Sequence, residues 1–304
     1  HISDIMRVMR FVTTVSLAQK MKQRESILLG LPIFAVVIVL FNLRSTSFSL
    51  PTSTNHEENP SPREPNLSIF IGIITRPDNY ERRHFLRLVY GLQSHPSARI
   101  AVRFVFCNLS KPEQRVFVAM ETLKFNDVVF LDCEENMNSG KTYAYFSSLP
   151  RILQERYDYV MKADDDVFLR LEPLALSLLP LPREDTYYGF VIPCDSQNPF
   201  VEYMSGMGFL LSWDIVEWIS RSPIPRNDTV GPEDKLVGRW LKRGKKAKNR
   251  FSMKPAMYDF PGTNGKCSHD LIPDTIAVHR LKRWDQWFAV LQFFNFTTFA
   301  LPSI

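Results

Sequence analysis

Three consecutive aspartates, Asp164, Asp165 and Asp166, follow the apolar run at 157–161. Carboxylates packed side by side repel one another, and a divalent cation turns that repulsion into attraction. Hard oxygen ligands of this kind suit Mg²⁺ or Mn²⁺, and such ions commonly hold the phosphates of a bound nucleotide. The triplet therefore indicates a metal-dependent enzyme acting on a nucleotide-activated substrate, although acidic runs also occur on solvated surfaces.

The elements that position the triplet alternate along the chain. Short apolar runs rich in β-branched and aromatic residues predict buried strands at 67–75, 101–107, 128–132 and 157–162. One-sided apolar stripes predict helices at 79–93, 111–125 and 139–155. We therefore predict an α/β fold with a mainly parallel central sheet flanked by helices. Ligands of such sheets gather beyond the carboxyl ends of the strands, which is where the triplet stands.

The pattern becomes more mixed after Pro193. Residues 203–212 lead into a predicted helix at 213–220, and a second helix at 232–242 has a proline at its start. Late strands at 256–260 and 275–279 precede a closing helix at 284–294. The basic run at 242–250 reads as a solvated helix end or loop, and we expect no nucleic-acid partner because no motif of that class is present.

The N-terminal part predicts attachment to a membrane. Residues 27–43 are uncharged and long enough for a short bilayer-spanning helix, and basic residues lie mainly before them. We expect a cytosolic tail at 1–26, with Met21 as a candidate natural start, a signal anchor at 27–43, a flexible stem at 44–66 and a lumenal catalytic domain at 67–304. A cleaved signal peptide is the competing interpretation.

Cysteines and glycosylation sequons agree with a lumenal domain. All four cysteines follow the predicted anchor, and they allow three disulfide pairings or remain free thiols: Cys107, Cys133, Cys194 and Cys267. Asn-X-Ser/Thr sequons begin at Asn66, Asn108, Asn227 and Asn295. Their common placement on one side of the anchor predicts a secretory-pathway glycoprotein.

Four sequence elements together carry a resemblance to a known family. They are KADDDVF at 162–168, ERRHFLR at 81–87, SGMGF at 205–209 and PEDKLVG at 232–238. In order and spacing they resemble the inverting β-1,3-galactosyltransferases, over about residues 67–294. The resemblance implies a GT-A-like nucleotide-sugar-binding fold, a UDP-sugar donor, Mn²⁺ or Mg²⁺ as cofactor, and a single-pass type II protein of the Golgi membrane.

The resemblance also implies roles for individual residues. Asp166 would be a direct metal ligand, Asp164 and Asp165 would contact the ribose or complete the metal shell, and His279 would be the late histidine ligand. Asp234 would be the catalytic base; the alternative is an acidic residue that merely favours the first turn of a helix. Arg82 and Lys141 would reach the nucleotide or, alternatively, form surface pairs.

The expected reaction is transfer of galactose from UDP-galactose, in β-1,3 linkage, to a glycan or glycoprotein acceptor. N-acetylglucosamine is the rival donor sugar, because the same motifs serve both. The family's N-L-T-x-K-T element reads NMNSGKT at 136–142 here, which leaves the choice of donor and acceptor open. Two readings from other classes are a metal-dependent phosphohydrolase and a noncatalytic glycan-binding or scaffold protein.

Overall fold

The structure, a computed structural model, describes residues 65–263 and 265–296. The predicted tail at 1–26, the anchor at 27–43 and nearly all of the stem at 44–66 lie outside these residues. Within the described part, no helix combines the length and the apolar character that crossing a bilayer requires. The expectation of a membrane anchor therefore stays a prediction.

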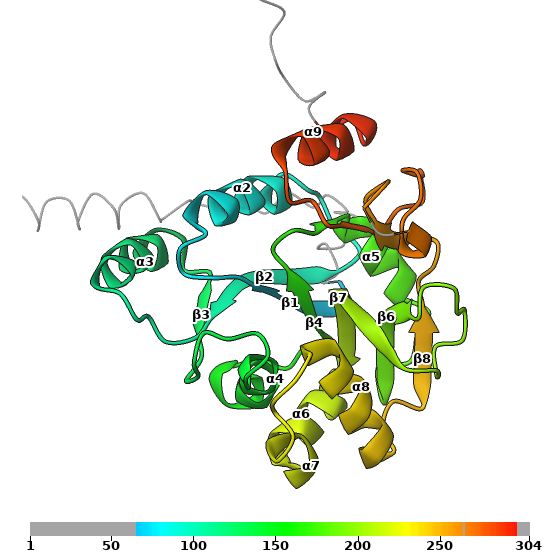
Figure 1. Ribbon diagram of the computed structural model, residues 1–304, viewed down its shortest axis with the longest axis horizontal. Coiled ribbons are helices and arrows are strands. Elements are labelled where there is room, and N and C mark those ends of the chain that lie inside the picture. The colour runs from blue at the N-terminus through cyan, green and yellow to red at the C-terminus, as the bar shows by residue number, and fades with distance from the viewer. Residues whose placement is uncertain (1–64, 264, 297–304) are drawn as a thin grey trace, which may run out of the picture. The chain divides into compact units, whose positions relative to one another are not determined.

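A seven-stranded sheet forms the centre of the described part, in the order β3-β2-β1-β4-β7-β6-β8 (Figure 1). β1 pairs in parallel with both β2 and β4, whereas β7 runs antiparallel to β4 and β6. β2 with β3 and β6 with β8 are also parallel pairs, so β7 alone runs against the other six strands, and the sheet is mainly parallel, as predicted. Its strands are β1 (Ser68–Ile74), β2 (Arg99–Phe106), β3 (Val128–Phe130), β4 (Tyr159–Asp164), β6 (Thr186–Ile192), β7 (Tyr203–Ser212) and β8 (Asn249–Ser252).

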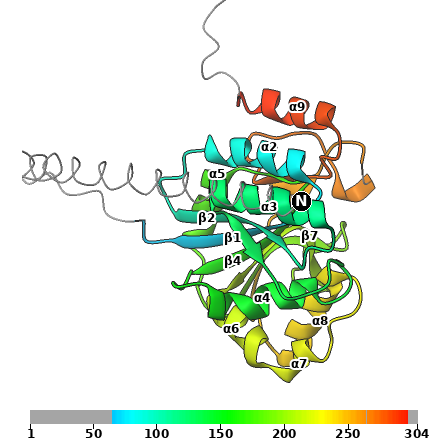
Figure 2. The same cartoon turned by 90° about the vertical axis from the view of Figure 1, so that its left-hand side faces the viewer.

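Helices cover both faces of this sheet (Figures 1 and 2). On one face lie α2 (Tyr80–Gly91), α3 (Pro112–Phe125), α5 (Leu171–Leu178) and α9 (Trp284–Phe293). On the other lie α4 (Lys141–Ile152), α6 (Trp213–Arg221), α7 (Pro223–Arg226) and α8 (Glu233–Gly244). Because side chains of a strand alternate, Ile71 and Ile73 of β1 join the core on the first face, and Phe70 and Ile74 join the core on the second.

A second, three-stranded sheet lies beside the aspartates. It has the order β5-β10-β9, formed by β5 (Phe168–Leu169), β9 (Met257–Asp259) and β10 (Ala277–His279). β10 pairs antiparallel with β5, which begins two residues after Asp166, so the pairing brings the end of β10 to the triplet. The strands at β9 and β10 were predicted, but β5 is too short for its periodicity to be read, and β6, β8 and α5 were also missed.

The cysteines form two disulfides, Cys107–Cys133 and Cys194–Cys267. This selects one of the three pairings and excludes free thiols. The first bridge ties the end of β2 to the segment after β3, and the second ties the segment after β6 to the short 3₁₀ turn at Gly265–Cys267. Each bridge thus holds a segment that follows the carboxyl end of a strand in the central sheet.

Helix α3 is oriented opposite to what its apolar stripe suggests. Met120 and Leu123 are 64% and 87% exposed, whereas Glu121 is buried. Glu121 faces α2, where it pairs with Arg83 at 2.8 Å and with Arg87 at 2.6 Å. Electrostatic pairing with α2 therefore decides which side of α3 turns inward, and these two arginines serve packing between helices.

Candidate active site

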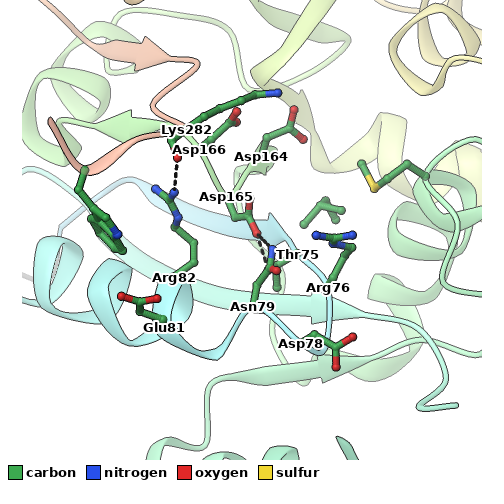
Figure 3. A pocket seen from close by; sticks show the side chains of 13 residues that line it. Thr75, Arg76, Asp78, Asn79, Glu81, Arg82, Asp164, Asp165, Asp166 and Lys282 are labelled. Atoms are coloured by element: carbon green, nitrogen blue, oxygen red, sulfur yellow. Dashed lines mark hydrogen bonds between the residues drawn. The ribbon is translucent and has the colours of Figure 1, made fainter. Parts of the chain in front are cut away.

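A cavity of about 590 Å³ opens beyond the carboxyl ends of β1 and β4 (Figure 3). Its walls come from the segment after β1, the start of α2, the aspartate triplet and the segment before α9. The labelled lining residues are Thr75, Arg76, Asp78, Asn79, Glu81, Arg82, Asp164, Asp165, Asp166 and Lys282. The triplet therefore faces a cavity at the edge of the sheet where the sequence predicted a ligand site.

Asp165 is fixed by the segment that follows β1. Its Oδ2 accepts hydrogen bonds from Thr75 Oγ1 at 2.6 Å and from Asn79 Nδ2 at 2.9 Å. These bonds join the ends of the neighbouring strands β1 and β4, so Asp165 shapes the floor of the cavity.

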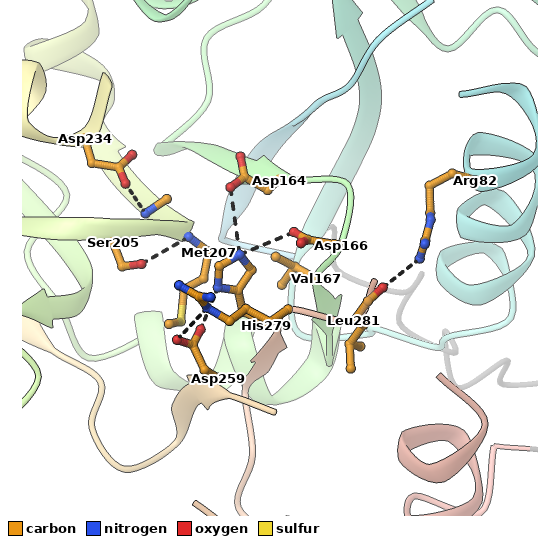
Figure 4. A network of polar contacts seen from close by, with 12 residues as sticks. Arg82, Asp164, Asp166, Val167, Ser205, Met207, Asp234, Asp259, His279 and Leu281 are labelled. Carbon is orange, nitrogen blue, oxygen red and sulfur yellow. Dashed lines mark hydrogen bonds and ion pairs between the residues drawn. The ribbon is translucent and has the colours of Figure 1, made fainter. Parts of the chain in front are cut away.

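The other two aspartates gather around His279 (Figure 4). His279 Nε2 lies 3.3 Å from Asp166 Oδ1 and 3.9 Å from Asp164 Oδ2. Each of the three residues offers one ligand atom, and these atoms lie within 4.8 Å of one another. Two carboxylate oxygens and an imidazole nitrogen form a set that suits Mn²⁺, so the residues fit the predicted cation.

His279 is held in this orientation from behind. Its Nδ1 lies 2.6 Å from Oδ1 of the buried Asp259, whose Oδ2 accepts a hydrogen bond from Arg280 Nε at 3.1 Å. A carboxylate on one ring nitrogen directs the other nitrogen toward a metal. Burial would lower the pKa of His279, but hydrogen bonds to Asp166 and Asp259 outweigh it and raise the pKa to about 9.

Lys162 connects the triplet to α8. Its side chain is fully buried, and its Nζ donates to Asp164 Oδ1 at 2.7 Å and to Glu233 Oε1 at 2.5 Å. Burial alone would lower the pKa of Lys162, but the charges of Asp164, Glu233 and Asp234 hold that pKa well above its usual range. The ammonium is therefore a permanent cation among carboxylates.

Asp234 stands in the first turn of α8, with its side chain directed at β7. Its Oδ2 accepts a hydrogen bond from Gly206 N at 2.6 Å. Oδ1 is buried and has no hydrogen-bond partner among the described residues, although Lys162 Nζ lies 3.9 Å away. Burial raises the pKa of Asp234 to about 7 against the opposing charge of Lys162. A carboxylate with that pKa suits a general base near neutral pH.

Gly206 makes this approach possible. A Cβ on Gly206 would lie 2.8 Å from Asp234 Oδ2 and 3.1 Å from Lys162 Nζ, so a side chain here would displace the carboxylate. Gly208, two residues on, instead faces the core, where a Cβ would lie 2.4 Å from Met161 Cε. On one strand, Gly206 thus leaves room for the Asp234 carboxylate, and Gly208 leaves room for core packing against Met161.

The remaining predicted residues lie at different depths. Arg82 lines the cavity, donates to Leu281 O at 3.0 Å and stacks over Trp284, with 5.0 Å from its guanidinium carbon to the ring centroid. Lys141 is fully buried and is not among the cavity's lining residues. Its ammonium donates to Thr75 O at 2.7 Å and to Glu135, so it supports the segment that carries Thr75. Direct contact of Lys141 with a nucleotide stays a prediction.

Sequence reasoning missed several members of the site. Lys162 and Glu233 were given no role in the site, and Asp259, Arg76 and Lys282 were not considered. Two signals were available: a lysine inside the apolar strand Tyr159–Asp164 must be paired if it is buried, and an acid ending β9 could support a histidine ending the next strand.

Comparison with known proteins gives one family match. The galactosyltransferase family model matches residues 81–249, more than half of the chain. The matched range contains Arg82, the aspartate triplet and Asp234, and it ends before Asp259 and His279.

The relatives of the chain have low sequence identity to it, and the curated ones are named as β-1,3-galactosyltransferases. It is 24% identical over 275 residues to β-1,3-galactosyltransferase pvg3 of Schizosaccharomyces pombe, covering 71% of each chain. It is 24% identical over 213 residues to mouse β-1,3-galactosyltransferase 1, covering 60% of this chain and 63% of that relative. Among solved structures, galactosyltransferase LgtC with donor and acceptor sugar analogs aligns with 78% of this chain and 98% of its own, at 15% identity and a TM-score of 0.43.

Proposed function

Because the chain belongs to the galactosyltransferase family and is a glycosyltransferase, we propose that it is a metal-dependent inverting hexosyltransferase. Its donor is UDP-galactose, its acceptor is a glycan or glycoprotein, and the linkage formed is β-1,3. The names of the fission yeast and mouse relatives support the donor sugar and the linkage. The observation that carries the proposal is that one buried lysine lies between Asp164, a member of the triad proposed to hold the cation, and the partly exposed carboxylate of Asp234.

The donor side of the reaction uses the open cavity. Asp164, Asp166 and His279 would hold Mn²⁺ or Mg²⁺ there. Such an ion, when bound, neutralises negative charge on a departing diphosphate. Arg82, Arg76 and Lys282 line the same cavity and would face the phosphates, and Asp165 would contact the nucleoside.

The acceptor side uses Asp234. Inversion at the anomeric carbon requires one base, which takes a proton from the attacking acceptor hydroxyl while UDP leaves from the opposite face. Asp234 is the candidate for three reasons: its side chain is 24% exposed, its pKa is raised, and its carboxylate accepts a hydrogen bond from the Gly206 amide. The proton moves from the acceptor hydroxyl to the Asp234 carboxylate as the new glycosidic bond forms.

We place the protein in the Golgi membrane as a single-pass type II protein with its catalytic part in the lumen. Two disulfides support an oxidising compartment. The side chains of Asn66, Asn108 and Asn227 are exposed, as carriers of glycans would be. The uncharged segment at 27–43 supports the anchor.

A donor panel tests this proposal. The purified lumenal part is incubated with UDP-galactose, UDP-N-acetylglucosamine or UDP-glucose, with Mn²⁺ or EDTA, and with candidate glycan acceptors. Mass spectrometry should show a hexose added from UDP-galactose in the Mn²⁺ samples and no product with EDTA. Transfer of N-acetylglucosamine would show that the donor is UDP-N-acetylglucosamine and not UDP-galactose. UDP-sugar cleavage without an acceptor-linked product would indicate a hydrolase. UDP binding without any turnover would indicate a noncatalytic protein.

A further inference from the structure

Lys162 lies between the two halves of the site and contacts a carboxylate of each. We propose that Lys162 is a positioning residue that holds the base-bearing first turn of α8 in fixed relation to the cation-facing aspartate at the end of β4. The inference rests on the proposed function and adds to it the element that keeps donor and acceptor sides in register.

The contacts of Lys162 divide between the two sides. On the donor side it binds Oδ1 of Asp164, which leaves Oδ2 as the oxygen on the side of His279. On the acceptor side it binds Oε1 of Glu233, and its Nζ lies 3.4 Å from Gly206 O and 3.9 Å from Asp234 Oδ1. The location of α8 relative to Asp164 thus depends on one ammonium.

Glu233 transmits this contact to the base. Its second oxygen, Oε2, accepts a hydrogen bond from Thr142 Oγ1 at 2.7 Å, so both oxygens are held. Pro232 caps α8 without any side-chain hydrogen bond, so the contacts of Glu233 and the bond from Gly206 N to Asp234 hold the first turn. Asp234 is the next residue, and any movement of Glu233 moves the base with it.

Charge explains why the arrangement needs a lysine. Asp164, Glu233 and Asp234 all face Lys162, and without its charge they would repel one another across a buried space. A neutral side chain of similar length, such as methionine, fills the volume but leaves the three carboxylates uncompensated. The first turn of α8 should then move away from β4.

Lys162→Met tests the inference by turnover, donor affinity and local exchange. We expect kcat to fall about a hundredfold, the scale of a small misplacement of a reacting group. Affinity for UDP with Mn²⁺ should stay equal or become tighter, because a cation next to the metal ligands is removed. In metal-free protein, hydrogen–deuterium exchange should quicken at the amides of 233–237 while the amides of β1 stay protected.

Lys141→Met is the matched control, since Lys141 is also a fully buried lysine with a carboxylate partner. It supports Thr75 on the donor side, so it should weaken UDP binding and leave exchange in α8 unchanged. Thr142→Val removes only the second anchor of Glu233 and should lower kcat about tenfold without changing the donor KM. If Lys162→Met does not fold, Thr142→Val decides alone.

The inference is overturned if kcat of Lys162→Met lies within threefold of the wild type, or if kcat, UDP affinity and protection throughout the sheet are lost together. With Thr142→Val, an unchanged kcat would overturn it equally. A wild-type protein that transfers no hexose would instead refute the proposed function. Hydrogen–deuterium exchange at the amides of 233–237 in the metal-free variants would still test the positioning role.

Discussion

The two halves of the site differ in how complete they are. On the donor side, Asp164 and Asp166 line an open cavity with His279 beside them, and Arg76 and Lys282 at its wall are exposed. On the base side, by contrast, Lys162 is fully buried and Asp234 lies against the backbone of Gly206. The donor half gathers charges that a cation and phosphates would balance, whereas the base half already contains a buried cation, Lys162, among its carboxylates.

This difference predicts separate consequences for substitutions. Changes in the donor half should act on binding of metal and nucleotide, because those ligands complete it. Changes in the base half should act on turnover, because that half is already assembled before any ligand arrives. Measurements that separate binding from turnover therefore test whether the two halves are distinct.

Asp234→Asn should have the largest effect. Without a carboxylate to accept the proton, kcat should fall about a thousandfold, while the Kd of UDP with Mn²⁺ stays within twofold. Isothermal titration calorimetry and a radiolabelled transfer assay measure the two quantities. Asp228→Asn, an acid-to-amide change that breaks a pair with Arg239 on the far side of α8, is the control. Unimpaired turnover of Asp234→Asn would remove it from the mechanism.

The pH profile should show the base directly. Burial raises the pKa of Asp234 to about 7, and only its deprotonated form accepts a proton. At saturating Mn²⁺, kcat/KM should therefore fall about tenfold per pH unit below 7 and level off above it. The residual activity of Asp234→Asn should lack this acid limb. A wild-type profile that is flat between about pH 5 and 8 would contradict the assignment.

Asp259→Asn should affect only the donor half. The neutral amide supports His279 less strongly, so affinity for Mn²⁺ should fall about 10-fold to 100-fold. At saturating Mn²⁺ kcat should recover. Asp285→Asn breaks an exposed pair with Arg283 and provides the control. Equal Mn²⁺ affinities of the wild type and Asp259→Asn would show that His279 is not a metal ligand.

Gly206→Ala and Gly208→Ala compare two positions on one strand. The first places a Cβ against the Asp234 carboxylate and should lower kcat about tenfold with UDP binding retained. The second clashes with the flexible end of Met161 and should lower Tm with kcat unchanged. A similar kcat for both variants would argue against a tightly set base.

Arg82→Ala should have the smallest effect. Arg82 is partly exposed at the cavity wall, so its loss should raise the donor KM about twofold to fivefold without lowering kcat. The exposed Arg115 of α3 supplies a control of equal charge, Arg115→Ala, which should leave KM unchanged. A fall in kcat for Arg82→Ala would show that this arginine also acts on the reacting atoms.

The sequence predicted local secondary structure well, but it predicted contacts between residues far apart in the chain poorly. The strands ending at Ile74 and Asp164 were predicted because continuous apolar runs signal buried parallel strands. That His279 meets Asp166 depends on β5, a two-residue strand that carries no readable period. The resemblance suggested the ligand set, but the sequence pattern alone offered no geometric reason for it.

Charged residues account for the other misses. Glu121 turns inward on α3 because arginines on another helix meet it, and Glu233 turns toward Lys162 instead of simply favouring its helix end. Partners 38 and 71 positions away decide these orientations. Helical periodicity describes only the near neighbours of a residue, so it could not anticipate them.

The stereochemistry of the product tests the central claim most directly. Transfer is run with UDP-galactose, whose anomeric bond is α, and the purified product is examined by proton NMR and linkage analysis. An inverting reaction through Asp234 predicts a β-galactosyl product joined to position 3 of the acceptor sugar. An α-linked product, or galactose released only to water, would contradict the account.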